Sequence, residues 1–375
     1  MSSPTEPERD GGEIVVGVLA DPEAAPTEVA THLGDRLAVS LGEQVTGDVS
    51  WQVDVRRERL PAGDRDIAAM IDVAANHAEE RGWHLTLCVT DLPLRSGRHP
   101  VVAELSRQRR VAVVSLPALG GMRLRHRVRG IAVQMVAELY RLDAEHADVE
   151  EERPGSWSRG LVQIDPDDDS VDVRLRVSRG RLRLLIGMVR ANRPWGLVLG
   201  LTSALAAAIA FSVFWLVNTA MWELAASLHA ARLATFAVLA VVAMVAWLII
   251  AHQLWERADD GLASDREEIA LFNASTLLTL LIGVGFMYLA IFLFNLTAGL
   301  LLFDGEVLEG HIEQPPDVWT WLAITWLATS AATIAGALGS SFENERTVHE
   351  AAYSYRERER RQRGDVGVPD TTSEG

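Results

Sequence analysis

The stretch ALFNASTLLTLLIGVGFMYLAIFLFNLTAGLLLF, residues 270–303, decides the class of this protein. It runs for 34 residues without a charged side chain. A helix of about 20 apolar residues crosses the hydrocarbon core of a bilayer, and buried helices of soluble proteins rarely reach this length. The stretch therefore predicts a membrane span centred on Asn273–Leu296. Its excess length predicts tilt, or an extension of the helix beyond the bilayer.

Three further uncharged stretches flank this one. They are Trp195–Val217, Leu233–Ala251 and Val318–Gly339. Together the four stretches predict an all-α four-helix transmembrane bundle within residues 184–340, with the lipid bilayer as its surroundings.

The distribution of arginine predicts the orientation of the spans. Seven arginines and no acid lie between Arg174 and Arg193, and the flanks of the four spans carry 7, 1, 2, 0 and 6 arginines in chain order. By the positive-inside rule, both termini are cytosolic and the protein lies in the cytoplasmic (inner) membrane. The segment Leu182–Pro194 fits a short interfacial helix whose arginines meet anionic headgroups, or a topology signal alone.

Residues 13–142 alternate strand and helix signals. Apolar or alternating runs predict strands at Glu13–Ala20, Trp51–Val55, Trp83–Val89 and Val111–Leu116. Helical spacing predicts helices at 29–41, 67–78 and 128–142, with a short helix at Val101–Arg107. This order predicts a cytosolic three-layer α/β domain with a mainly parallel sheet.

The remaining segments are polar. Residues 1–12 have no apolar core and read as a disordered tail. Residues 143–183 read as an acidic linker that ends in a short ribbon at 173–183, and residues 341–375 as a charged cytosolic tail.

Composition excludes several kinds of chemistry. The net charge of −16 argues against nucleic acid as a partner. All 35 basic residues are arginine, and the absence of lysine excludes a Walker A loop and a Schiff-base lysine. Cys88 is the single cysteine and reads as a buried core residue. Because no HExxH or GxSxG motif occurs, we predict no metal, no cofactor and no catalytic residue.

Polar residues gather where the predicted parallel strands end. Asp21 follows the first strand, Thr90 and Asp91 follow the third, and Ser115 ends the fourth. Ligands of such sheets bind beyond the carboxyl ends of the strands, so these four residues form a candidate ligand site. The alternative is that the two aspartates cap turns through nearby backbone amides.

The spans contain hydroxyl and amide side chains but no ionisable residue at their centres. Thr276, Thr279, Asn295 and Thr297 fit a polar pore, or hydrogen bonds between helices. Spaced glycines, including Gly336 and Gly339, favour close helix packing and leave a homo-oligomer open.

Several strings resemble a family of four-span actinobacterial integral membrane proteins of unknown function. The resemblance rests on LLIGMVRANRPWGLV (184–198), LWERA (254–258), residues 271–296 and residues 87–120. Some members carry a methylenetetrahydrofolate dehydrogenase-like label, which this sequence does not support because that family uses a catalytic lysine.

The order VTDLPL, VAVVSLPAL and then a helix is similar to the layout of archaemetzincin peptidases. In that family the helix carries a zinc motif. Here the corresponding positions are Val133, Gln134 and Ala137, so the resemblance implies a domain without zinc chemistry.

These observations favour a multi-pass membrane protein with a non-catalytic cytosolic domain that binds a protein partner or a small ligand, or serves as a scaffold. One alternative is a transporter or channel component formed by the bundle. The other is an enzyme with a site at the sheet edge near Asp91.

Overall fold

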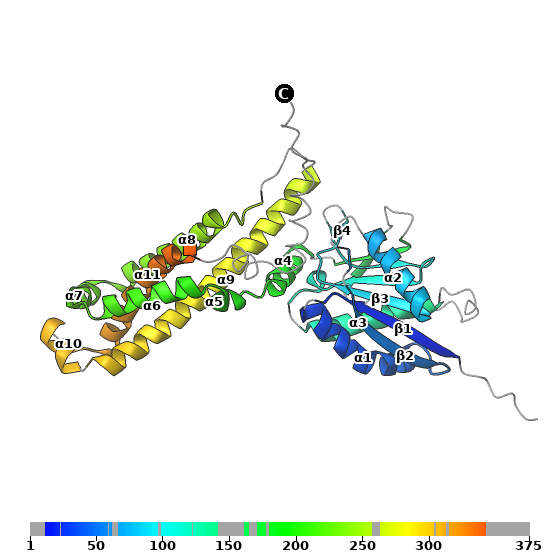
Figure 1. Cartoon of the computed structure of the whole chain (residues 1–375), viewed down its shortest axis with the longest axis horizontal. Helices are drawn as coiled ribbons and strands as arrows, with labels where there is room; N and C mark the ends of the chain where they lie inside the picture. The colour runs from blue at the N-terminus through cyan, green and yellow to red at the C-terminus, as the bar shows by residue number, and fades with distance from the viewer. Residues whose placement is uncertain are drawn as a thin grey trace, which may run out of the picture. The chain divides into compact units, whose positions relative to one another are not determined.

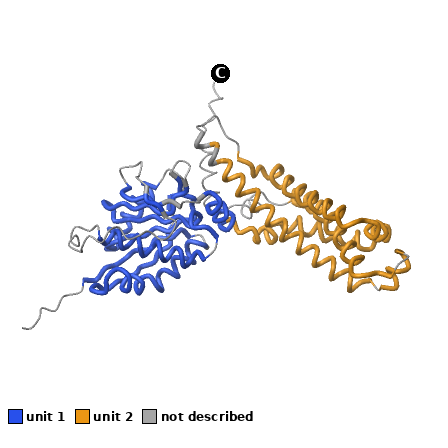
Figure 2. Tube along the Cα trace, turned by 180° about the vertical axis from the view of Figure 1, so that it is seen from behind, with its two compact units in different colours: residues 1–191, 355–375 blue, residues 192–354 orange. Residues whose placement is uncertain are grey.

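The computed structural model describes residues 12–22, 24–58, 60–61, 67–96, 99–121, 123–141, 161–164, 171–177, 180–256, 263–303, 305–312 and 315–342. The chain divides into two compact units, which comprise residues 1–191 with 355–375, and residues 192–354 (Figure 2). Most of the predicted N-terminal tail, linker and C-terminal tail lies outside the described residues.

Unit 1 is an α/β structure (Figure 1). Its strands are β1 (Glu13–Ala20), β2 (Ser50–Arg57), β3 (Leu85–Thr90), β4 (Arg95–Ser96), β5 (His99–Ser106), β6 (Val111–Ser115), β7 (Leu161–Ile164) and β8 (Val173–Val177). Its helices are α1 (Ala24–Gln44), α2 (Ile67–Arg81), the 3-10 turn η1 (Pro117–Leu119), α3 (Leu124–Arg141) and α4 (Gly180–Ala191).

Seven strands form one mixed sheet in the order β2-β1-β3-β6-β5-β8-β7, and β4 pairs with β5. The ladders β1–β2, β1–β3 and β3–β6 are parallel. The ladders of β5 with β6 and β8, and of β7 with β8, are antiparallel. The prediction of a mainly parallel sheet is therefore wrong for one half of the sheet.

The difference begins at Val101–Arg107, where the sequence predicts a helix and the structure has strand β5. A four-residue turn, in which Arg110 has φ 55° and its N–H bonds the carbonyl of Arg107 at 3.1 Å, sends the chain back as β6. Both faces of β5 are covered, so Val101, Val102 and Ala103 are all buried and the apolar alternation of a half-exposed strand is lost.

The predicted ribbon at 173–183 is also different. Strand β8 joins the main sheet beside β5, and the residues from Gly180 onward form helix α4. A buried ion pair fixes this register, because Arg174 Nε donates to Glu104 Oε1 at 2.6 Å between directly paired positions. Strand β7 pairs with β8 and lies within the segment that the sequence predicts as linker.

Helices cover the parallel half of the sheet. Helix α2 packs through Met70 and Ile71 against Leu19, Cys88 and Val113. Helices α1 and α3 pack against each other and against the sheet, on the face opposite α2 (Figure 1). This arrangement gives unit 1 the helix–sheet–helix layering expected for alternating strands and helices.

Unit 2 is helical. Its elements are α5 (Gly196–Gly200), α6 (Thr202–Leu216), α7 (Thr219–Ser227), α8 (Ala230–Ala251), α9 (Ala263–Leu302), α10 (Gly305–Ile312), α11 (Val318–Gly339) and the 3-10 turn η3 (Ser340–Phe342). Three stretches, Ala230–Ala251, Ile269–Leu302 and Val318–Phe342, are each long and apolar enough to cross a membrane. The chain is therefore a membrane protein by the length and composition of these helices.

Helix α11 is the central helix of unit 2. Of its most apolar window, 72 % is buried, against 28 % in Ala230–Ala251 and 33 % in Ile269–Leu302. Small residues allow α11 to be buried among its neighbours. A Cβ added at Gly339 would lie 2.5 Å from the Cβ of Ala207 and 2.9 Å from the carbonyl oxygen of Ser203. The glycine spacing thus allows α6 and α11 to pack closely.

The span predicted at Trp195–Val217 is not one straight helix. Helices 181–200 and 202–216 meet at a 49° bend, and Leu201 lies at the break with φ −100° and ψ 59°. Just before the bend, the chain packs against α9, where a Cβ at Gly283 would lie 2.9 Å from the carbonyl oxygen of Pro194. The pair counts as a fourth span only if the bent helices cross together.

Candidate functional site

The strand-end residues of unit 1 are buried and hydrogen-bonded to one another. The side chains of Asp21, Thr90 and Ser115 are fully buried, and Asp91 is 6 % exposed. Both carboxylate oxygens of Asp21 accept a hydrogen bond, Oδ2 from the hydroxyl of Thr90 at 2.9 Å and Oδ1 from the backbone N–H of Leu60 at 3.2 Å. Asp21 therefore connects the ends of β1 and β3 to the segment that follows β2.

Thr90 and Ser115 hold the next loop in place. The Oγ1 of Thr90 accepts from the backbone N–H of Leu92 at 3.2 Å. The hydroxyl of Ser115 donates to the carbonyl of Leu92 at 2.6 Å and accepts from the N–H of Leu94 at 3.4 Å. The structure thus brings Asp21 into contact with Thr90, as a shared sheet edge requires, and uses Ser115 to anchor residues 92–94 in the interior.

The hydrogen bonds of this cluster connect separate backbone segments of unit 1. A buried carboxylate is costly to desolvate, and hydrogen bonds from a backbone N–H and a hydroxyl offset that cost. Both oxygens of Asp21 accept from donors that are distant in the sequence, the N–H of Leu60 and the hydroxyl of Thr90. Asp91, which the sequence groups with it, lies buried beside the same loop.

Helix α3 carries the positions that the archaemetzincin resemblance points to. Val133 is buried, and neither Val133 nor Ala137 has a side-chain atom that could bind a metal. Among the residues that the structure describes, no group of three or more His, Cys, Asp or Glu side chains could hold a metal ion.

Cys88 lies in β3 and is fully buried. Burial raises the pKa of its thiol from an ordinary 9.0 to about 12. Because the thiolate is the nucleophilic form of cysteine, this residue belongs to the core and not to a reactive site.

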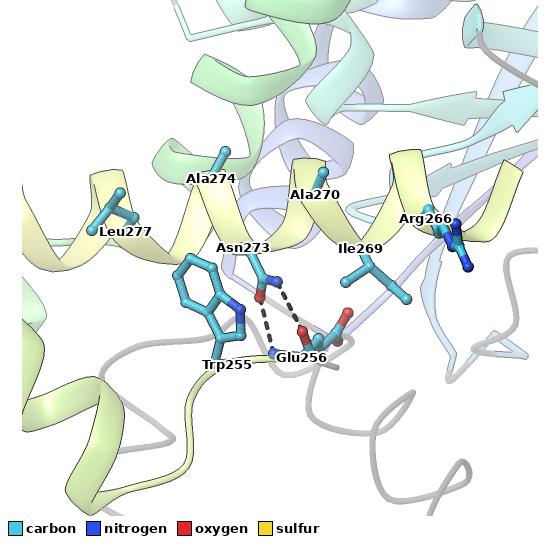
Figure 3. Close-up of a pocket in the computed structure, with 8 residues that line it drawn as sticks. All are labelled: Trp255, Glu256, Arg266, Ile269, Ala270, Asn273, Ala274 and Leu277. Atoms are coloured by element: carbon cyan, nitrogen blue, oxygen red, sulfur yellow. Dashed lines mark hydrogen bonds between the residues drawn. The ribbon is translucent and has the colours of Figure 1, made fainter. Parts of the chain in front are cut away.

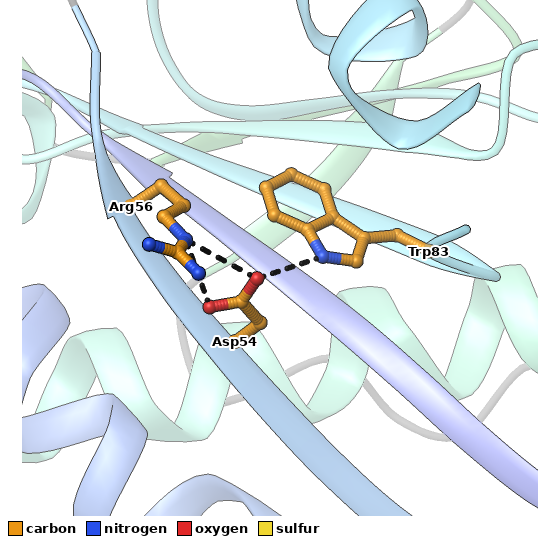
Figure 4. A network of polar contacts seen from close by, with 3 residues as sticks. All are labelled: Asp54, Arg56 and Trp83. Carbon is orange, nitrogen blue, oxygen red and sulfur yellow. Dashed lines mark hydrogen bonds and ion pairs between the residues drawn. The ribbon is translucent and has the colours of Figure 1, made fainter. Parts of the chain in front are cut away.

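A second polar network lies over strands β1 and β2 (Figure 4). The indole N–H of Trp83 donates to Oδ2 of Asp54 at 3.1 Å, and Arg56 Nε lies 3.1 Å from Oδ1 of the same carboxylate. The indole covers β1 at Gly17, where an added Cβ would overlap the ring. This network fixes the start of β3 over β1 and β2.

Unit 2 has a shallow groove of about 540 Å³ beside the N-terminal part of α9 (Figure 3). Its lining comprises Trp255, Glu256, Arg266, Ile269, Ala270, Asn273, Ala274 and Leu277. None of these residues belongs to a site predicted from the sequence. The signal available was the string LWERA at 254–258, directly before the longest uncharged stretch of the chain.

Asn273 lines the groove, and its amide also bonds the backbone of Glu256. Its Oδ1 accepts from the backbone N–H of Glu256 and its Nδ2 donates to the backbone carbonyl of Glu256, both at 2.9 Å (Figure 3). The two bonds hold the segment after α8 against α9. Trp255 remains 48 % exposed, as expected for a tryptophan near the membrane surface.

Polar side chains within the apolar helices mostly bond to neighbouring helices or to their own backbone. Asn295 Nδ2 donates to Oγ1 of Thr329 at 3.1 Å, and Asn192 Nδ2 donates to Oγ1 of Thr279 at 3.3 Å. Thr276 and Thr297 donate to the carbonyls four residues earlier. These four predicted pore residues therefore do not gather into one site.

No family model, curated protein or solved structure matches this chain.

Proposed function

We propose that this is a multi-pass protein of the cytoplasmic membrane whose α/β unit is a non-catalytic binding or scaffold domain. The observation that carries the proposal is the hydrogen bonding of Asp21. Both of its carboxylate oxygens accept hydrogen bonds from Leu60 and Thr90 of the same unit. The cluster of polar residues at the strand ends therefore stabilises this edge of the sheet. A domain whose polar residues support its own architecture, and which is followed in the chain by membrane helices, is suited to binding at the membrane surface.

The test is affinity purification of the full chain in mild detergent, with mass spectrometry of co-purifying proteins and small molecules. The matched variant is Gly17→Val, which we expect to unfold unit 1 by driving a side chain into Trp83 and to leave the membrane helices in place. We expect a partner or ligand that is retained by the wild-type chain and lost from the variant. An identical set from both chains would refute a binding role for unit 1.

We also propose that Trp195–Val217, which contains the bend at Leu201, crosses as one span, so that four spans place both termini in the cytoplasm. The arginine distribution supports this orientation. In a Cys88→Ser background, single cysteines at Thr46 and Gly310 should label from opposite sides of the membrane with an impermeant maleimide. Labelling of both from the same side would contradict the proposal.

A second candidate function is transport by unit 2. Asn295 is fully buried, and among the described residues its Oδ1 has no hydrogen-bond partner. An unpaired buried acceptor is costly in an apolar helix bundle unless a ligand or water meets it. Flux into liposomes that Asn295→Leu abolishes, and that Thr297→Val leaves unchanged, would favour this function.

A further inference from the structure

Two arginines from distant parts of unit 1 contact the loop that follows β6. This loop, residues 116–123, contains η1 and then Gly120 and Gly121. Helix α4 packs on it so closely that a side chain at Gly187 would overlap the backbone of Pro117. The side chain of Arg183 crosses Gly120, whose φ is +81° and where an added Cβ would lie 2.7 Å from Cγ of Arg183.

Arg127 reaches the same loop from the first turn of α3. Its Nη1 donates to the carbonyl of Leu119, the residue before Gly120, at 2.7 Å. The pKa of Arg183 is lowered by burial and, in addition, by the positive charge of Arg127. The two guanidinium groups are therefore near enough to repel each other.

Nothing in the described part of the chain neutralises this pair. Arg125, two residues from Arg127, pairs with Glu28, whereas neither Arg127 nor Arg183 forms an ion pair with a described acid. Holding two like charges together at a partly desolvated position is unfavourable, and an anion between them reverses the sign of that interaction.

The location of the two arginines and the chemistry of their side chains indicate which class of anion they bind. The loop lies beyond the carboxyl end of β6, the side of the sheet on which α/β proteins bind ligands. Guanidinium groups are planar and bind phosphate oxygens through two parallel N–H donors, and two such groups suit a dianion better than a halide.

We propose that Arg127 and Arg183 form a binding site for a phosphoryl group. This inference rests on the proposed binding role of unit 1 and names the class of ligand. The phosphoryl group belongs either to a soluble phosphorylated compound or to an anionic lipid headgroup, since α4 directly precedes the first apolar helices in the chain.

The test uses the full chain in neutral detergent, at constant ionic strength, with two probes. Inorganic phosphate is titrated by calorimetry against a chloride blank, and phosphatidylglycerol is compared with phosphatidylcholine by native mass spectrometry. Arg127→Gln/Arg183→Gln should weaken binding at least tenfold, and Arg183→Lys, which keeps the charge and loses the fork of donors, should weaken it less. The control Arg36→Gln/Arg129→Gln removes the same charge elsewhere on unit 1 and should stay within twofold of wild type.

Binding of phosphate alone identifies a soluble ligand, and binding of phosphatidylglycerol alone identifies a lipid headgroup. Binding of neither probe, or equal binding by the double variant and the control, overturns the proposal. The rate at which Cys88 reacts with a thiol reagent reports whether unit 1 of each variant remains folded. If phosphate binding is absent while a partner still co-purifies with wild-type chain and not with Gly17→Val, the inference fails and the binding role stands.

Discussion

The side-chain amide of Asn273 forms two hydrogen bonds of 2.9 Å with the backbone N–H and C=O of Glu256. Like the edge of a β-strand, it offers one acceptor and one donor to the backbone of the segment that follows helix α8. The two residues lie on different elements, so this amide links residue 256 to helix α9.

Replacing Asn273 should loosen this segment. Asn273→Ala removes the two hydrogen bonds from this amide to the backbone of Glu256, and each lost hydrogen bond at a partly buried site costs about 1–3 kcal/mol. Asn273→Asp keeps the acceptor and loses the donor, so the exchange rate of this variant should lie between those of the wild type and Asn273→Ala. Hydrogen exchange of residues 252–256 in the detergent-solubilised chain measures the effect. Exchange as slow in Asn273→Ala as in wild type would show that other contacts hold the segment.

Cys88 should be unreactive in the folded protein. Its pKa of about 12 keeps it protonated and its full burial excludes reagents, so at pH 8 a thiol reagent should modify it only after unit 1 unfolds. Since this is the sole thiol of the chain, its modification in increasing urea reports the free energy of unfolding of unit 1 within the intact protein.

The same residue makes stability depend on alkaline pH. Burial raises the pKa of Cys88 in the folded protein, so its contribution to the free energy of unfolding is complete below pH 9.0, the ordinary pKa of a thiol. Between pH 9.0 and about 12 the thiol ionises in the unfolded chain and not in the folded one, and this contribution is lost as the pH rises. Cys88→Ala should remove this part of the pH dependence. Rapid modification at pH 8 without urea would disprove the buried assignment.

Asp21→Ala should destabilise unit 1 strongly. The substitution leaves the hydroxyl of Thr90 and the N–H of Leu60 without their acceptor, and we expect a loss of about 2–5 kcal/mol from two buried donors. Asp35→Ala, an exposed carboxylate on α1, should change stability by less than about 0.5 kcal/mol. Urea-dependent modification of Cys88 measures the free energy of unfolding of both variants. Equal stability of the two would show that the hydrogen bonds of Asp21 do not stabilise unit 1.

Gly17→Ala should also be destabilising, because the added methyl group overlaps the indole of Trp83. Overfilling a packed core costs about 1–3 kcal/mol. In a Trp83→Leu background the same change should cost much less, and the double-mutant cycle isolates the contact. Gly42→Ala is the control, since nothing lies within 4 Å of its added Cβ and alanine favours the helix. Equal costs in both backgrounds would show that the clash is relieved elsewhere.

The sequence by itself determined the class of the protein and most of its elements. The thickness of the bilayer requires an apolar helix of a length that few other environments require. Uncharged runs such as 270–303 therefore identify membrane helices without knowledge of the residues that pack against them. Strands β1, β3 and β6 were likewise predictable, because they are apolar runs bounded by turn residues. The common edge of Asp21 and Thr90 followed from parallel strands, whose carboxyl ends lie on one side.

Tertiary structure decided what depends on pairing and packing. Strand β5 is buried on both faces, so no local period distinguishes it from a helix, and its place is set by β6, β8 and the Glu104–Arg174 pair. The bend at Leu201 accompanies close packing at Gly283, which comes much later in the chain. That Arg127 and Arg183 contact the same loop depends on α4 packing against η1, a long-range contact that no local pattern of charge or hydropathy encodes.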